Sequence, residues 1–216
     1  MWNLRLNNNK AWFEQHKNEF IRDFQTPVKA LGREVFERIS ADFGGRGFIH
    51  KVSRIYKDAR RVRDGEPYRA NLWFSIERPA GSAEQWTSVP TFWFDIHPDG
   101  WSYGLGYYAA RAETMAKFRA RISENPKKFE KLIAPLEKQD EFVLEGPEYA
   151  RKKEAPTAKT APWYNRKSFY LIHQQPIGKD IFSPELASRL IKGYAFLMPI
   201  YDYLITLDSD PAPIGY

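Results

Sequence analysis

A short turn between two aromatic runs places the strongest constraint on the fold of this chain. The runs TFWFDIH and WSYGLGYY are rich in aromatic and β-branched residues, and each is too short for a helix of core length. Between them lie Pro98 to Gly100, where an Asp that tolerates unusual φ angles precedes a Gly, as a hairpin turn favours. Strands near 91–97 and 101–108 are therefore expected to pair in the antiparallel direction.

The sequences before and after this hairpin show the periodicity of helices. Phe13, Phe20 and Phe24 fall on one face of a helix that begins at Lys10, where a preceding Asn can cap the first turn. Further helices are predicted from Pro27 to Gly44, after Ala109, from Pro126, and after the capping residue Ser183, with a kink or break at Pro199. The run NLWFSIERP and residues 168–173 are predicted as strands, and 151–167 as a loop.

This order of elements predicts an α+β fold, in which an antiparallel β-sheet packs against several α-helices. The chain shows no internal repeat and no linker long enough to divide it. We expect a single domain over residues 1–208 and a flexible C-terminal tail over 209–216.

The composition narrows the functional classes. The chain has 216 residues and no cysteine, which excludes disulfides, thiolate catalysis and cysteine-based metal sites. Its start lacks the apolar run of a signal peptide, and no window approaches the roughly 18 apolar residues of a membrane span. We therefore expect a cytoplasmic protein with no membrane partner.

The basic charge is concentrated in one segment. Eight basic and three acidic residues lie between Arg46 and Arg69, so this stretch holds +5 of the chain's net charge of +6. Arginine predominates, which favours two-point recognition of phosphate or carboxylate groups. The arginine-rich stretch RIYKDARRVRDGEPYR, which we call the basic segment (residues 54–69), is therefore the predicted binding site for a small phosphorylated or carboxylated anion.

The candidate ligand-binding residues extend beyond the basic segment. The glycines of YGLGYY would let backbone approach a ligand, and a helix start beside an anion offers free N–H groups. The full predicted set is Arg54, Lys57, Arg60, Tyr68, Arg69, Gly104, Gly106 and Asn9. If the site is catalytic, Asp58 or Asp64 is the candidate base, because neighbouring arginines lower the pKa of a carboxyl group.

Alternative interpretations remain for the same residues. The basic segment could be an internal ion-pair network, helped by the acidic stretch at 137–145, a nucleic-acid-binding surface, or a protein-interaction patch. His97 and His173 lie on predicted strands and could converge with Asp95, although a packed strand histidine is more common than a metal ligand. We predict no metal and no cofactor, and the sequence leaves open whether the protein is an enzyme.

Three segments carry a family resemblance. NNNKAWFEQHK, the basic segment, and YGLGYY followed by a helix with Arg119 resemble, in order and spacing, the bacterial family known as domain of unknown function 2461. Of that family's central pattern the chain matches Arg54, Asp58, Arg60, Asp64, Pro67 and Tyr68. It departs from the pattern at Lys57, Gly65 and Arg69, where arginine, lysine and lysine are usual. The resemblance supports the fold and the location of a site, and it implies no activity.

Overall fold

The structure is a computed structural model that describes residues 1–58 and 65–213. In this part of the chain six strands form one antiparallel sheet, which together with several helices makes the fold α+β, as predicted. The strands lie in the order β1 (Ile49–Val52), β2 (Leu72–Glu77), β3 (Thr91–His97), β4 (Gly100–Gly106), β6 (Tyr170–Gln175) and β5 (Val143–Glu145). The neighbouring positions of β3 and β4 confirm the predicted hairpin.

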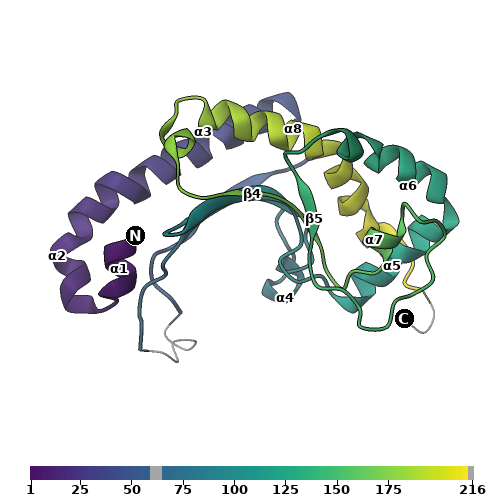
Figure 1. Ribbon diagram of the computed structural model, residues 1–216, viewed down its shortest axis with the longest axis horizontal. Coiled ribbons are helices and arrows are strands. Elements are labelled where there is room, and N and C mark those ends of the chain that lie inside the picture. The colour runs from purple at the N-terminus through teal and green to yellow at the C-terminus, as the bar shows by residue number, and fades with distance from the viewer. Residues whose placement is uncertain (59–64, 214–216) are drawn as a thin grey trace. The chain divides into compact units, whose positions relative to one another are not determined.

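The helices occupy the ends of the chain and the connections between strands (Figure 1). They are α1 (Trp2–Leu6), α2 (Lys10–Phe20), α3 (Thr26–Asp42), α4 (Ala83–Trp86), α5 (Ala112–Glu124), α6 (Pro126–Ile133), α7 (Ala161–Tyr164) and α8 (Leu186–Ile205). A π-helical turn, η1 (Ile21–Gln25), joins α2 to α3, and the 3-10 helices are η3 (Ala134–Lys138), η4 (Lys179–Phe182) and η5 (Thr206–Ser209). Among the described residues, no helix is long and apolar enough to cross a membrane.

The chain forms two compact units, and neither is a single continuous segment. Unit 1 contains Met1–Ile76, Trp93–Tyr103 and Gln174–Lys192, and unit 2 contains Glu77–Phe92, Gly104–His173 and Gly193–Tyr216. Strands β2, β3, β4 and β6 each have residues in both units. The proposal that residues 1–208 fold as one domain stays a prediction.

In unit 1, helix α3 packs on strands β1 and β2. Figure 1 shows α2 and α3 following one another, with η1 between them. The buried face of α3 includes Val28, Val35 and Ile39. At Gly32 an added Cβ would lie 2.4 Å from Nε2 of His50, so a larger residue would require the His50 side chain or α3 to shift.

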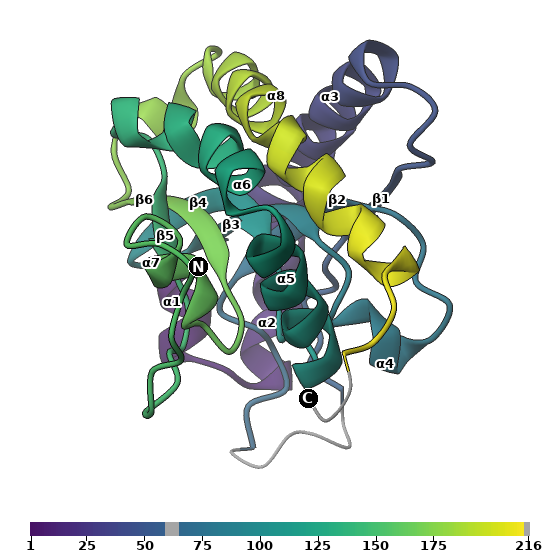
Figure 2. The same ribbon diagram turned by 90° about the vertical axis from the view of Figure 1, so that its right-hand side faces the viewer.

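In unit 2 aromatic side chains fill the space between α5, α6, α7 and the end of α8. Phe118 of α5 contacts Phe129 of α6 at a ring distance of 5.4 Å and Tyr203 of α8 at 6.3 Å. Trp163 of α7 contacts Phe129 at 5.5 Å. Figure 2 shows α5 beside the last turns of α8. This packing fixes the C-terminal end of α8 against α5.

Several local predictions were wrong or incomplete. The predicted loop 151–167 contains α7, and α1, α4, β1 and β5 were not predicted. Ser183 does not cap α8: its hydroxyl accepts the N–H of Glu185 in a turn, and α8 begins at Leu186. Pro199 does not interrupt α8, which continues to Ile205. The helix tolerates the hydrogen bond that Pro199 cannot donate, because Leu197, Tyr201 and Leu204 on either side of the proline are buried in the core.

Candidate functional site

The two ends of the basic segment lie side by side. Tyr56 and Tyr68 form an isolated antiparallel bridge. The N–H of Lys57 donates to the carbonyl of Pro67 at 2.8 Å, and that of Arg69 donates to the carbonyl of Ile55 at 2.7 Å. This ladder places Arg69 opposite Ile55, the neighbour of Arg54 in the chain.

Some described side chains of the basic segment are engaged in the fold, whereas others make no hydrogen bond or ion pair with the described residues. Tyr68 is buried, with its ring 4.2 Å from that of Phe13, and Lys57 Nζ lies 3.3 Å from a carboxylate oxygen of Glu66. Arg54 is exposed and Arg69 half-buried. Within residues 1–58 and 65–213, no hydrogen bond or ion pair reaches either guanidinium group.

The structure describes only one of the two predicted catalytic residues, Asp58. Asp58 is half-buried and has an interaction partner. Asp64 and Arg60 lie outside the described residues. The roles of these three side chains in binding or catalysis stay predictions.

The three asparagines before α2 have structural partners. Asn9 caps α2, because its side-chain oxygen accepts the N–H of Trp12 at 3.0 Å. Asn8 pairs with the backbone of Tyr68: its Nδ2 donates to the Tyr68 carbonyl at 2.9 Å, and its Oδ1 accepts the Tyr68 N–H at 3.0 Å. Asn7 donates to the carbonyl of Asn3. The Asn8 amide therefore holds the backbone of the basic segment through two hydrogen bonds. The sequence analysis did not predict this role.

Gly104 and Gly106 lie buried in β4. A Cβ on Gly106 would lie 2.4 Å from Cα of Tyr170, so this glycine permits the close approach of β6. Strand packing thus accounts for Gly106 without a ligand.

The strand histidines have separate partners. Nδ1 of His97 accepts the backbone N–H of Asp99, and Nδ1 of His173 lies 3.0 Å from the carbonyl oxygen of Glu141. Burial raises the pKa of Asp95, while a hydrogen bond from Asn71 and the charge of His97 act in the opposite direction. No group of three or more potential metal ligands occurs among the residues that the structure describes.

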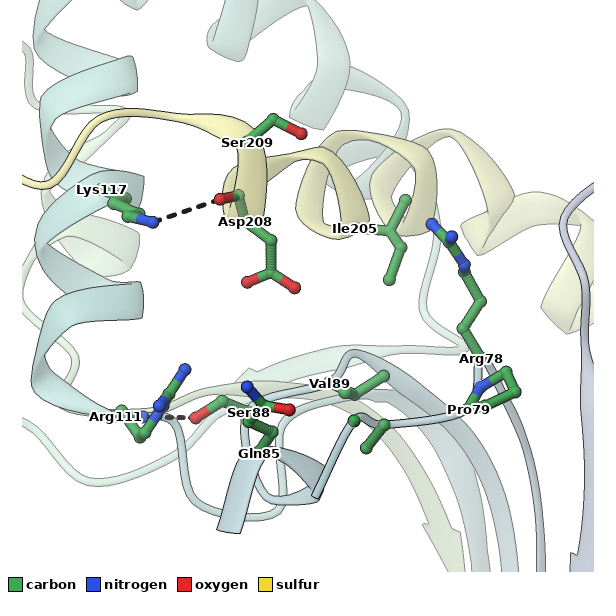
Figure 3. A pocket seen from close by; sticks show the side chains of 12 residues that line it. Arg78, Pro79, Gln85, Ser88, Val89, Arg111, Lys117, Ile205, Asp208 and Ser209 are labelled. Atoms are coloured by element: carbon green, nitrogen blue, oxygen red, sulfur yellow. Dashed lines mark hydrogen bonds between the residues drawn. The ribbon is translucent and has the colours of Figure 1, made fainter. Parts of the chain in front are cut away.

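A cavity of about 460 Å³ lies within unit 2 (Figure 3). Its lining comes from the segment after β2, from the end of α4 and the residues that follow it, from α5 and its N-cap residue, and from the C-terminal part of the chain. The lining residues are Arg78, Pro79, Ala80, Gly81, Gln85, Ser88, Val89, Arg111, Lys117, Ile205, Asp208 and Ser209. None of them belongs to the predicted site.

Hydrogen bonds hold the walls of this cavity in place. Glu77, the last residue of β2, is fully buried, and its carboxylate accepts the indole N–H of Trp86 at 2.9 and 3.0 Å and the hydroxyl of Thr91 at 3.4 Å. These bonds tie α4 to the end of β2. On the opposite side, the hydroxyl of Ser88 accepts the backbone N–H of Arg111 at 2.8 Å, which fixes the N-cap of α5.

Three basic side chains and one carboxylate face the cavity. Figure 3 shows the guanidinium groups of Arg78 and Arg111 on opposite sides of the cavity, with the carboxylate of Asp208 between them. All three residues are exposed. Lys117 Nζ donates to the backbone carbonyl of Asp208 at 3.3 Å and pairs with Glu113 at 3.3 Å. In the described part of the chain, the charged ends of Arg78, Arg111 and Asp208 make no hydrogen bond or ion pair.

A second group of hydrogen bonds ties the backbone near Asp208 to α5. Arg121 of α5 donates two hydrogen bonds of 2.6 Å to the carboxylate of Asp210 and further bonds to the carbonyls of Tyr203 and Thr206. The backbone on both sides of Asp208 is therefore tied to α5. Two of these bonds hold Asp210, the second residue of the predicted tail, against α5.

The central pattern of the basic segment and the comparison with protein families agree. The family model described as "Conserved hypothetical protein (DUF2461)" matches residues 1–203. The chain belongs to this family. A search of curated proteins found no match. Arg78, Arg111 and Lys117 lie within the matched residues, and Asp208 lies beyond them.

Proposed function

We propose that this protein binds a small anionic ligand, phosphorylated or carboxylated, in the cavity of unit 2. The observation that carries the proposal is that Arg78 and Arg111 line one cavity without a protein partner for either guanidinium group among the described residues. A guanidinium group offers several N–H donors in a plane that matches the oxygens of phosphate and carboxylate groups.

The size and charge of the cavity support the same ligand class. A volume of about 460 Å³ is in the range of small-molecule sites. Three basic side chains against one carboxylate leave an excess of positive charge in the lining. Lys117 adds to this field, but it is already engaged with Glu113, so the two arginines are the groups that would contact the ligand directly.

The basic segment remains a second candidate place for an anion of the same class. Arg54 and Arg69 are its available cations in the described part, whereas Lys57 is paired with Glu66. The cavity is preferred because Arg78 and Arg111, although exposed like Arg54, both line one concave space.

Matched double variants test the proposal. Thermal unfolding of the wild type is measured with inorganic phosphate, pyrophosphate, oxalate and short oligonucleotides, and compared with Arg78→Gln/Arg111→Gln and with Arg54→Gln/Arg69→Gln. Each pair removes two arginine charges. An anion at 100 times its Kd should stabilise the wild type by about 2.7 kcal/mol, or about 5 to 10 °C. The cavity pair should lose this shift, and the basic-segment pair should keep it.

Three results would contradict the proposal. A shift lost only in the basic-segment pair would move the site to that segment. An equal loss in both pairs would indicate attraction by net charge instead of a site. Binding of oligonucleotides with a steep loss of affinity at higher salt, and no response to the small anions, would favour the nucleic-acid alternative.

A further inference from the structure

We propose that one face of the sheet in unit 1 binds a neutral sugar ring. The ring stacks on the indole groups of Trp73 and Trp93. Its hydroxyl groups donate hydrogen bonds to the side-chain oxygens of Asn71 and Asp95. None of these four residues lines the unit 2 cavity, so the inference does not depend on the function proposed above.

The alternation of side chains along the strands separates this face from the core. Phe94 of β3 contacts Phe74 of β2 at a ring distance of 5.3 Å and Trp101 of β4 at 6.1 Å, so these three buried side chains share the core face. Half-exposed residues next to them in the strands point to the opposite side of the sheet, which we call the outer face. The outer face carries Trp73, Trp93, Asp95 and Ser102.

A hydrogen bond between side chains shows how the two tryptophans are placed. Nδ2 of Asn71, the residue before β2, donates to Oδ1 of Asp95 in β3 at 2.5 Å. Trp73 comes two residues after Asn71, and Trp93 comes two residues before Asp95. Because β2 and β3 are antiparallel neighbours, Trp73 and Trp93 are direct or diagonal neighbours on one face. The outer face therefore holds an aromatic surface beside a carboxylate.

The oxygens beside this aromatic surface are acceptors without a donor in the described chain. Asn71 uses its amide N–H on Asp95, and no described residue donates to Asn71 Oδ1 or to Asp95 Oδ2. Asp95 differs from an exposed surface aspartate, because burial removes part of its hydration and raises its pKa. A partly desolvated acceptor without a donor favours a ligand that supplies O–H or N–H groups.

The charges of unit 1 favour a neutral ligand at this face. The Asp95 carboxylate and the unused acceptors repel an anion. The stretch from Arg46 to Arg69 in the same unit has a net charge of +5, which disfavours a cation. A sugar ring meets both conditions, because its hydroxyl groups donate hydrogen bonds and its C–H groups pack on the electron-rich face of an indole.

Binding is measured by isothermal titration calorimetry with glucose, cellotriose and maltotriose on the full chain. The test variants are Asp95→Asn and Trp93→Ala. The matched controls are Asp42→Asn and Trp2→Ala, which remove an exposed carboxylate and an exposed tryptophan from helices of the same unit. Thermal unfolding without sugar shows whether each variant is folded.

The wild type and both controls should bind at least one of the three sugars with the same Kd. Asp95→Asn keeps the size of the side chain but replaces an acceptor with a donor, so it should weaken binding about tenfold or more. Trp93→Ala should weaken binding by about tenfold through the loss of stacking. If Trp93→Ala is not folded, the comparison of Asp95→Asn with Asp42→Asn decides.

Two results would overturn the inference. One is that none of the three sugars binds the wild type. The other is that Asp95→Asn binds sugar as tightly as Asp42→Asn, which would place the sugar elsewhere on the protein. Equal binding of glucose and a trisaccharide would identify a site for a single ring, whereas tighter binding of a trisaccharide would identify a site for a glycan chain; either result supports the inference.

Discussion

Arginine is abundant in the basic segment and sparse around the unit 2 cavity, yet the cavity is the better candidate site. In the basic segment the described groups are largely used by the fold: Tyr68 is buried, Lys57 pairs with Glu66, and Asn8 holds the backbone. Around the cavity, Arg78 and Arg111 come from separate elements and face one space. We therefore give more weight to charges that line one cavity and are not used by the fold than to the density of charge along the sequence.

The largest expected effect concerns the wall of the cavity. Glu77→Ala should reduce the free energy of unfolding by about 3 kcal/mol, because it leaves the indole N–H of Trp86 without its acceptor and opens a void at a fully buried position. Urea denaturation followed by tryptophan fluorescence measures this change. The Glu77→Gln variant, which keeps an acceptor oxygen, should lose clearly less.

The corresponding anchor of the basic segment should give a smaller effect. Asn8→Ala removes a donor and an acceptor that pair with the backbone of Tyr68, and we expect a loss of about 1 to 2 kcal/mol in the same denaturation assay. Asn7→Ala is the neighbouring control, since its side chain bonds only within the exposed first turn. A larger loss for Asn8→Ala than for Glu77→Ala would reverse the comparison and make the basic segment the more tightly built region.

The smallest effect is expected for the ion pair of the basic segment. Lys57 and Glu66 are both partly exposed, with side-chain exposures of 26% and 48%, and such pairs contribute about 0 to 1 kcal/mol. A double-mutant cycle with Lys57→Met and Glu66→Gln measures the coupling directly. A coupling above about 2 kcal/mol would mean that the segment is a rigid ion-pair network, and would support a structural role for its remaining arginines.

The sequence predicted those features that depend on neighbouring residues. The hairpin around Pro98 to Gly100 and the helix capped by Asn9 follow from local turn and cap chemistry, and both are present. Aromatic and helical periods together gave the α+β class correctly. Pro199 shows the limit of such rules, since burial on both sides of it maintains a helix that local propensity would end.

The cavity could not be predicted, because its parts are distant in the chain. Arg78 follows a strand, Arg111 precedes a helix, and Asp208 lies in a 3-10 turn after the last helix, so no spacing rule relates them. Asn8 carried a weak signal, since one asparagine sufficed as the cap and two others remained without a role. Its partner, the backbone of Tyr68, is 60 residues away and became visible only in the fold.

The bond between Arg121 and Asp210 also bears on where this protein can be shortened. A chain cut at residue 203, where the family match ends, would retain Arg78, Arg111 and Lys117 but would lack Asp208, Asp210 and η5. Arg121 would then lose its carboxylate partner, and the lining of the cavity would keep its positive groups without the negative one. Truncation at this point is therefore expected to loosen the end of α8 against α5 and to change the charge of the cavity lining.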